Sequence, residues 1–83
     1  MARFTRVLEV GEEPPVTLIF EAASQQGAIE ATLEELQTLV QEHPGMMSAA
    51  AIIGEGDGAR DAVKWMGGWV WRVGKGYSWT EMD

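Results

Sequence analysis

Carboxylates are the side chains of this sequence most able to do chemistry, and their distribution favours binding over catalysis. The chain has 13 Asp and Glu against 6 Lys and Arg, for a net charge of −7. No lysine or arginine occurs between Val7 and Ala59, a stretch that holds ten acids. Neighbours such as Glu34 and Glu35 point apart on a helix, and nothing apolar beside them predicts acid–base work. The stretch would attract a basic partner and repel nucleic acid or an anionic membrane.

Other reactive side chains are scarce. The absence of cysteine excludes disulfides, thiolate zinc sites and a cysteine nucleophile, and it favours a reducing compartment. His43 is the only histidine, and its position before Pro44 predicts a helix C-cap, where positive charge is favourable. A metal site would need carboxylates for its other ligands. We therefore expect no enzyme, no metal and no cofactor.

The glycine-rich segment 54–59 formally matches the G-x-G-x-x-A pattern of dinucleotide sites. That pattern requires a following helix and further parallel strands, which the short remaining chain does not offer, and Glu55 and Asp57 would repel a pyrophosphate. As a calcium loop, Glu55, Asp57 and Asp61 lack the bidentate glutamate that closes an EF-hand. We expect a mobile turn here.

Two strands and a turn are predicted at the start of the chain. Residues 3–10 and 16–22 alternate between apolar and polar positions, the period-two pattern of strands, and turn residues lie between them. A five-residue loop would pair Val10 with Val16 and Leu8 with Leu18, which brings the apolar faces together.

An amphipathic helix is predicted next, from an N-cap at Ser24 to about Glu42. An apolar stripe at helical spacing supports it, formed by Ile29, Leu33, Leu36 and Val40. Pro44-Gly45 would end the helix.

The last third of the chain predicts a β-meander. Residues 48–53 form a short apolar run that suggests a buried strand. Gly67-Gly68 between two apolar runs is a two-residue hairpin signal. A second turn at 74–76 would pair Val73 with Tyr77 and Trp71 with Trp79.

The resulting order, β-β-α-β-β-β, predicts an α+β fold. We expect two layers, an antiparallel or mixed sheet of four to five strands with the amphipathic helix on one face. Residues 1–83 should form a single domain, because so short a chain cannot divide its buried surface between two cores. We expect no membrane span and no secretory signal.

Two surfaces are candidate binding sites. The first is acidic, and its alternative interpretation is a solvated face kept for solubility. Its candidate contacts are Glu12, Glu13, Glu30, Glu34, Glu35 and Glu42. The second is aromatic, and its alternative interpretation is packing within the core. An exposed aromatic patch would serve self-association as a homodimer or act as a hot spot for another protein. Its candidate residues are Trp69, Trp71, Tyr77 and Trp79.

Our first functional hypothesis is a non-enzymatic inhibitor or regulator that occludes a basic protein surface, one that normally holds nucleic acid. The class analogy is with phage-encoded inhibitors such as anti-CRISPR proteins and DNA mimics, and it rests on size, charge and the lack of catalytic residues rather than on a sequence match. The protein would then act in the cytoplasm, or in the host cytoplasm if phage-encoded, without contacting nucleic acid or membrane directly. The second hypothesis is a structural or assembly protein that self-associates through the tryptophans.

Overall fold

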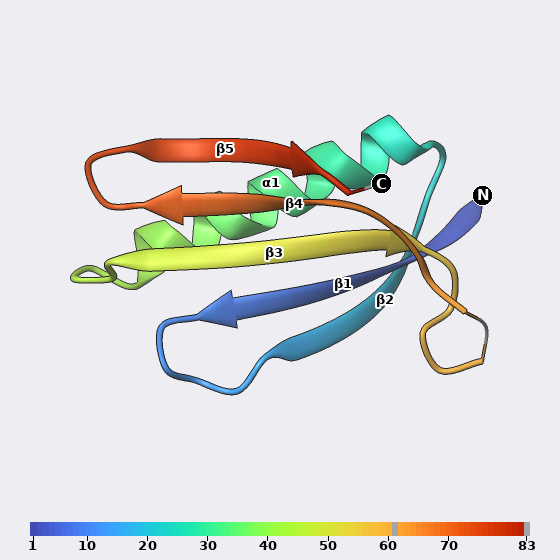
Figure 1. The fold of residues 1–83 in the computed structure, drawn as a ribbon, viewed down its shortest axis with the longest axis horizontal. Coiled ribbons are helices and arrows are strands. Elements are labelled where there is room, and N and C mark those ends of the chain that lie inside the picture. The colour runs from blue at the N-terminus through green and yellow to red at the C-terminus, as the bar shows by residue number, and fades with distance from the viewer. Residues whose placement is uncertain (61, 83) are drawn as a thin grey trace.

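The computed structural model describes residues 1–60 and 62–82, which form an antiparallel sheet with a helix packed on it (Figure 1). Asp61, part of the calcium interpretation, lies outside the described residues. The elements are β1 (Ala2–Val10), β2 (Val16–Ala22), α1 (Gln25–Glu42), β3 (Ser48–Glu55), β4 (Lys64–Arg72) and β5 (Gly76–Glu81). Their spatial order is β2-β1-β3-β4-β5, and each neighbouring pair is antiparallel. The predicted α+β class and element order are confirmed, with an antiparallel sheet of five strands.

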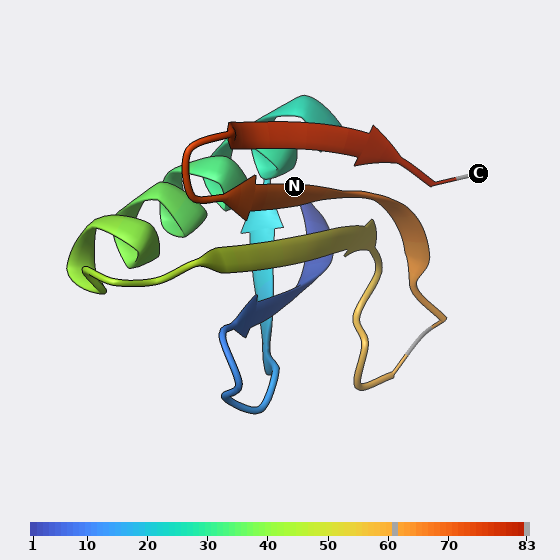
Figure 2. The ribbon, with the colours of Figure 1, turned by 60° about the vertical axis from the view of Figure 1, so that its left-hand side comes forward.

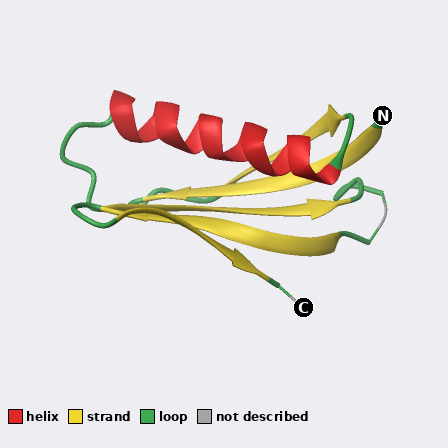
Figure 3. Cartoon of the chain, turned by 90° about the horizontal axis from the view of Figure 1, so that it is seen from above, coloured by secondary structure: helices red, strands yellow, loops and turns green. Residues whose placement is uncertain are grey.

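The layers follow from strand alternation, because successive side chains of a strand point to opposite faces. Figure 3 shows α1 lying along one face of the sheet, which leaves the other face open. Phe4 and Leu8 of β1 point toward the helix and are buried. Two core clusters lie between the layers. One contains Leu8, Leu36, Ala49 and Ala51, and the other contains Phe4, Ala28 and Ile53.

The helix begins and ends where the sequence predicts. Ser24 is the N-cap, and its side chain accepts a hydrogen bond from the backbone N–H of Gly27 at 3.0 Å. At the other end, the Nδ1 of His43 donates to the carbonyl of Leu39 at 2.8 Å, as expected of a C-cap residue. The fully buried stripe is formed by residues four apart, Ala28, Thr32 and Leu36. The other residues of the predicted stripe, Ile29, Leu33 and Val40, are half-buried beside it.

The predicted register of the β1–β2 hairpin is wrong by two residues. Leu8 pairs with Val16 rather than with Leu18, and Val10 pairs with Ala49 of β3. A shift of two keeps every side chain on its predicted face, because the period of a strand is two. The end of β1 is held by β3 instead of by β2, which lengthens the turn.

The β4–β5 hairpin differs from prediction in the same way. Trp71 pairs with Tyr77, and Trp69 with Trp79, where the sequence suggested Trp71 opposite Trp79. The turn itself lies at the predicted residues, with positive φ angles of 77° at both Gly74 and Gly76.

The predicted Gly67-Gly68 turn is wrong, because both glycines lie within β4. Neither has a positive φ, so backbone conformation does not require glycine there. Space does. A methyl group at Gly67 would lie 2.5 Å from the carbonyl oxygen of Thr80 and 2.6 Å from the Trp79 ring. Gly67 therefore provides the space in which Trp79 packs against the sheet.

Candidate functional site

Three candidate acids of α1 are exposed and unneutralised. Glu30, Glu34 and Glu42 are exposed along the helix. Glu30 accepts a long hydrogen bond of 3.4 Å from Gln26. Among the described residues, the ion pairs within 4.0 Å join Arg3 to Glu21 and Asp57, and none involves these helix acids. The helix thus presents a surface of uncompensated negative charge.

Of the remaining three candidate acids, Glu35 is also exposed on α1, and Glu12 and Glu13 lie outside the helix. Glu12 and Glu13 are exposed in the turn between β1 and β2, where the N–H of Glu13 donates to the carbonyl of Val10 at 3.2 Å. Glu13 and Glu35 both border a groove between this hairpin and α1. The structure therefore divides the predicted acidic site among the exposed surface of α1, the edge of a groove and the turn between β1 and β2.

The aromatic candidates lie on the sheet face that carries α1. Trp69 donates its indole N–H to the carbonyl of Ile29 in the helix at 3.1 Å. Its ring lies 5.2 Å from that of Trp79, and the Trp71 and Tyr77 rings are 6.3 Å apart. All four are partly buried against the two core clusters. This packing accounts for the cluster structurally, and self-association through it stays a prediction.

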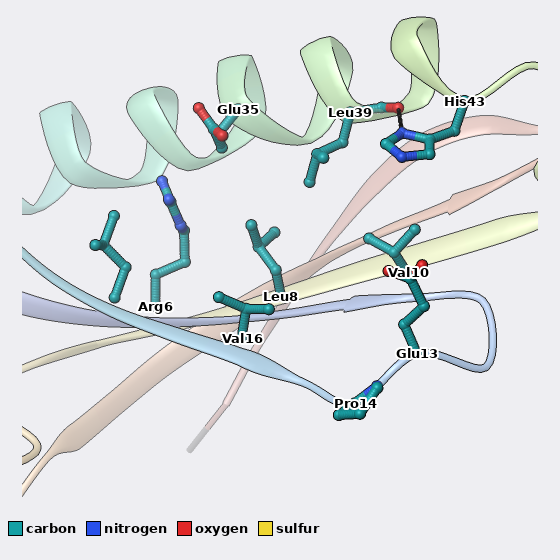
Figure 4. A pocket seen from close by; sticks show the side chains of 10 residues that line it. Arg6, Leu8, Val10, Glu13, Pro14, Val16, Glu35, Leu39 and His43 are labelled. Carbon is teal, nitrogen blue, oxygen red and sulfur yellow. Dashed lines mark hydrogen bonds between the residues drawn. The ribbon is translucent and has the colours of Figure 1, made fainter.

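The groove is a feature that the sequence did not predict. It has a volume of about 270 Å³ and lies between α1 and the β1–β2 hairpin (Figure 4). The turn of this hairpin extends away from the helix (Figures 1 and 2), and Val16 and Leu18 on β2 stay 62% and 45% exposed. The apolar lining consists of Leu8, Val10, Pro14, Val16, Leu18 and Leu39. The ionisable lining consists of Arg6, Glu13, Glu35 and His43.

Arg6 is the unusual residue of the groove. It extends from β1 toward α1 (Figure 4), yet the residue is only 8% exposed. Its Nε is buried without a hydrogen-bond partner, and the described residues place no carboxylate within ion-pair distance of it. The guanidinium carbon lies 5.6 Å from the centre of the Phe20 ring, a cation–π arrangement. Burial lowers the pKa of Arg6, and the charge of Glu35 partly opposes this shift.

The sequence contained a signal for this residue. Alternation places Arg6 between Phe4 and Leu8 on the apolar face of β1, where a charged side chain is out of place. Such a residue is often functional or paired. The groove itself depends on how α1 is placed over β2, which no local pattern reports.

The glycine-rich loop is anchored to the open face of the sheet rather than free. Asp57 accepts hydrogen bonds from the side chain of Arg3 at 3.0 Å and from the N–H of Ala59 at 2.9 Å. Thr5 donates to the carbonyl of Gly56 at 2.8 Å and accepts from the N–H of Gly58 at 2.9 Å. In the described ranges, no three acidic or histidine side chains lie close enough to hold a metal ion.

Replacing Asp57 with asparagine will remove a pH-dependent part of the stability. The Ala59 N–H is the main cause that lowers the pKa of Asp57; burial opposes it, and Arg3 and Arg60 lower the pKa further. A carboxyl with a lowered folded-state pKa stabilises fully above its unfolded pKa of about 3.9, and that contribution disappears as pH falls through the folded value.

Urea unfolding at several pH values measures this effect. The stability difference between the wild type and Asp57→Asn should be constant near neutral pH and shrink below about pH 4. Asparagine can still accept from Ala59, so the comparison isolates the charge. A difference that does not change with pH would contradict the assignment.

Neither a protein-family model, nor a curated protein, nor a solved structure matches this chain. In the described part of the chain, no helix combines the length and the apolar character needed to cross a membrane. The acidic surface of α1 and the groove must therefore be interpreted from their own geometry.

Proposed function

We propose that this protein is a non-enzymatic binding protein whose acidic α1 surface docks on a basic surface of a protein partner. The observation that carries the proposal is the row of exposed helix carboxylates, Glu30, Glu34 and Glu42, for which the described residues provide no ion pair. Charges of one sign on one element are suited to a surface of the opposite sign.

The placement of these acids does not serve the helix. Glu30 and Glu34 are like charges four residues apart, which costs about 0.2–0.5 kcal/mol. Glu42 lies at the negative end of the helix dipole, where an acid is unfavourable. Acids placed anywhere on the surface would serve solubility equally well. Binding to a basic surface gives a reason for their placement on a helix that contains no lysine or arginine.

The proposed mechanism is occlusion. The carboxylates would occupy the positions that phosphates take on a nucleic-acid-binding surface, and opposite charge would accelerate encounter. An inhibitor or regulator of this kind needs no chemistry of its own. We place it in the cytoplasm, in the same functional class as phage-encoded anti-CRISPR and DNA-mimic proteins.

Affinity capture from the native host at two salt concentrations tests the proposal. The Debye length falls from about 10 Å at 0.1 M salt to about 3 Å at 1 M, so exposed charge pairs are screened at high salt. We expect a partner with a basic surface to be captured at 0.1 M and released at 1 M. Retention of the same partner at 1 M, or a partner with an acidic contact surface, would contradict the proposal.

A further inference from the structure

The groove between α1 and the β1–β2 hairpin has the construction of a small-molecule site. Its volume of about 270 Å³ is close to the lower end of ligand pockets, which measure about 300–1,000 Å³. Aliphatic side chains form its walls, contributed by Leu8, Val16 and Leu18 of the hairpin and Leu39 of the helix. The exposure of Val16 and Leu18 leaves apolar surface that a ligand would cover.

Arg6 gives the groove a specific polar group. Its side chain lines the groove, it is more than nine-tenths buried, and its Nε has no partner. A buried guanidinium is stable when its donors are matched, and a carboxylate matches two of them at once. The unmatched donor therefore favours a carboxylate over a neutral group as the headgroup of a bound molecule.

The other ionisable groups do not reverse this preference. Glu13 and Glu35 border the groove but are exposed, so water and salt screen their repulsion of an anion. Arg6 is buried, and its attraction acts through a lower dielectric. His43 is also exposed, and its Nδ1 is already engaged with Leu39.

We propose that the groove binds a small aliphatic monocarboxylate. The carboxylate would accept hydrogen bonds from Arg6, and the aliphatic chain would lie against Leu8, Val16 and Leu39. The size of the groove suits a medium-length chain better than a long one. This site is separate from the acidic surface of α1, so octanoate binding should persist in the variant Glu30→Lys/Glu34→Lys.

Octanoate is the probe, and octanamide of the same chain length is its neutral control. Titration calorimetry, with NMR shifts to locate binding, should detect octanoate at the groove and at least tenfold weaker binding of octanamide. Arg6→Met should weaken octanoate binding at least tenfold. Arg72→Met, which removes an exposed arginine of β4, should leave it unchanged.

A second variant keeps the test decisive if Arg6→Met fails to fold. Leu39→Trp should fill the groove, abolish octanoate binding and leave Arg6 in place. Equal binding of octanoate and octanamide, binding that survives both Arg6→Met and Leu39→Trp, or no binding to the wild type would each overturn the proposal.

Discussion

Gly67→Ala will lower the free energy of unfolding by about 1–3 kcal/mol, the range typical of overpacking. The added methyl group would lie 2.5 Å from the Thr80 carbonyl oxygen and 2.6 Å from the ring of Trp79. The first of these atoms belongs to the backbone of β5, so it can move only by disturbing the β4–β5 pairing. At an unstrained position, the same substitution would stabilise by about 0.4–1 kcal/mol through the unfolded chain. A loss of stability would therefore show that the added methyl group is overpacked against Thr80 and Trp79, and a gain would show that it is not.

Gly68→Ala is the matched control on the opposite face of β4. Its methyl group would lie 3.0 Å from the Cγ2 of Ile52 and 3.2 Å from the Ala51 carbonyl oxygen, a tight fit in which the Ile52 side chain can adjust. Urea unfolding followed by tryptophan fluorescence should show a smaller loss for Gly68→Ala than for Gly67→Ala. Wild-type or higher stability of Gly67→Ala would show that Trp79 does not pack over that position.

These glycines also show which parts of the fold local patterns report. The helix limits and the faces of the β1 and β2 residues were correctly predicted, because both depend on a period of 3.6 or 2 within one segment. The Gly67-Gly68 turn was wrong because glycine signals a turn by local chemistry, whereas here it provides space for a side chain of another strand. The position of Trp79 over Gly67 is a tertiary fact.

Strand register was mispredicted for a related reason. A slide of two residues preserves both faces, so the apolar pattern of β1 cannot distinguish Leu8 opposite Val16 from Leu8 opposite Leu18. The pairing of Val10 with Ala49 decides between them, and it requires knowledge that β3 lies beside β1. Turn length then follows from the sheet rather than from the turn residues.

The candidate site also has one part that local patterns predict and another part that depends on tertiary structure. Helical geometry alone places Glu30 and Glu34 together on the exposed side of α1. The separation of Glu35 toward the groove, and its proximity to Arg6, depends on how the helix crosses the β1–β2 hairpin. This separation matters for the choice of variants, since changing Glu35 would disturb both surfaces at once.

Reversing two helix charges, Glu30→Lys with Glu34→Lys, will weaken binding of the captured partner by roughly a hundredfold. Each reversal replaces an attraction to the basic surface with a repulsion, and a loss of about 1.4 kcal/mol per position corresponds to a factor of ten each. Folding should be little changed, because both side chains are exposed and lysine favours helices about as well as glutamate. Affinity measured at 0.1 M salt, with circular dichroism as the folding check, gives the result.

A second double variant with the same net charge distinguishes the effect of local contacts at α1 from the effect of overall charge. Glu9→Lys with Glu81→Lys reverses two exposed acids on β1 and β5, and both double variants change the net charge from −7 to −3. If α1 is the docking surface, this second variant should slow association slightly and leave the affinity within about threefold, because long-range charge mainly affects encounter. Equal losses in the two variants would show that the partner responds to total charge, and the specific role proposed for the helix would then be wrong.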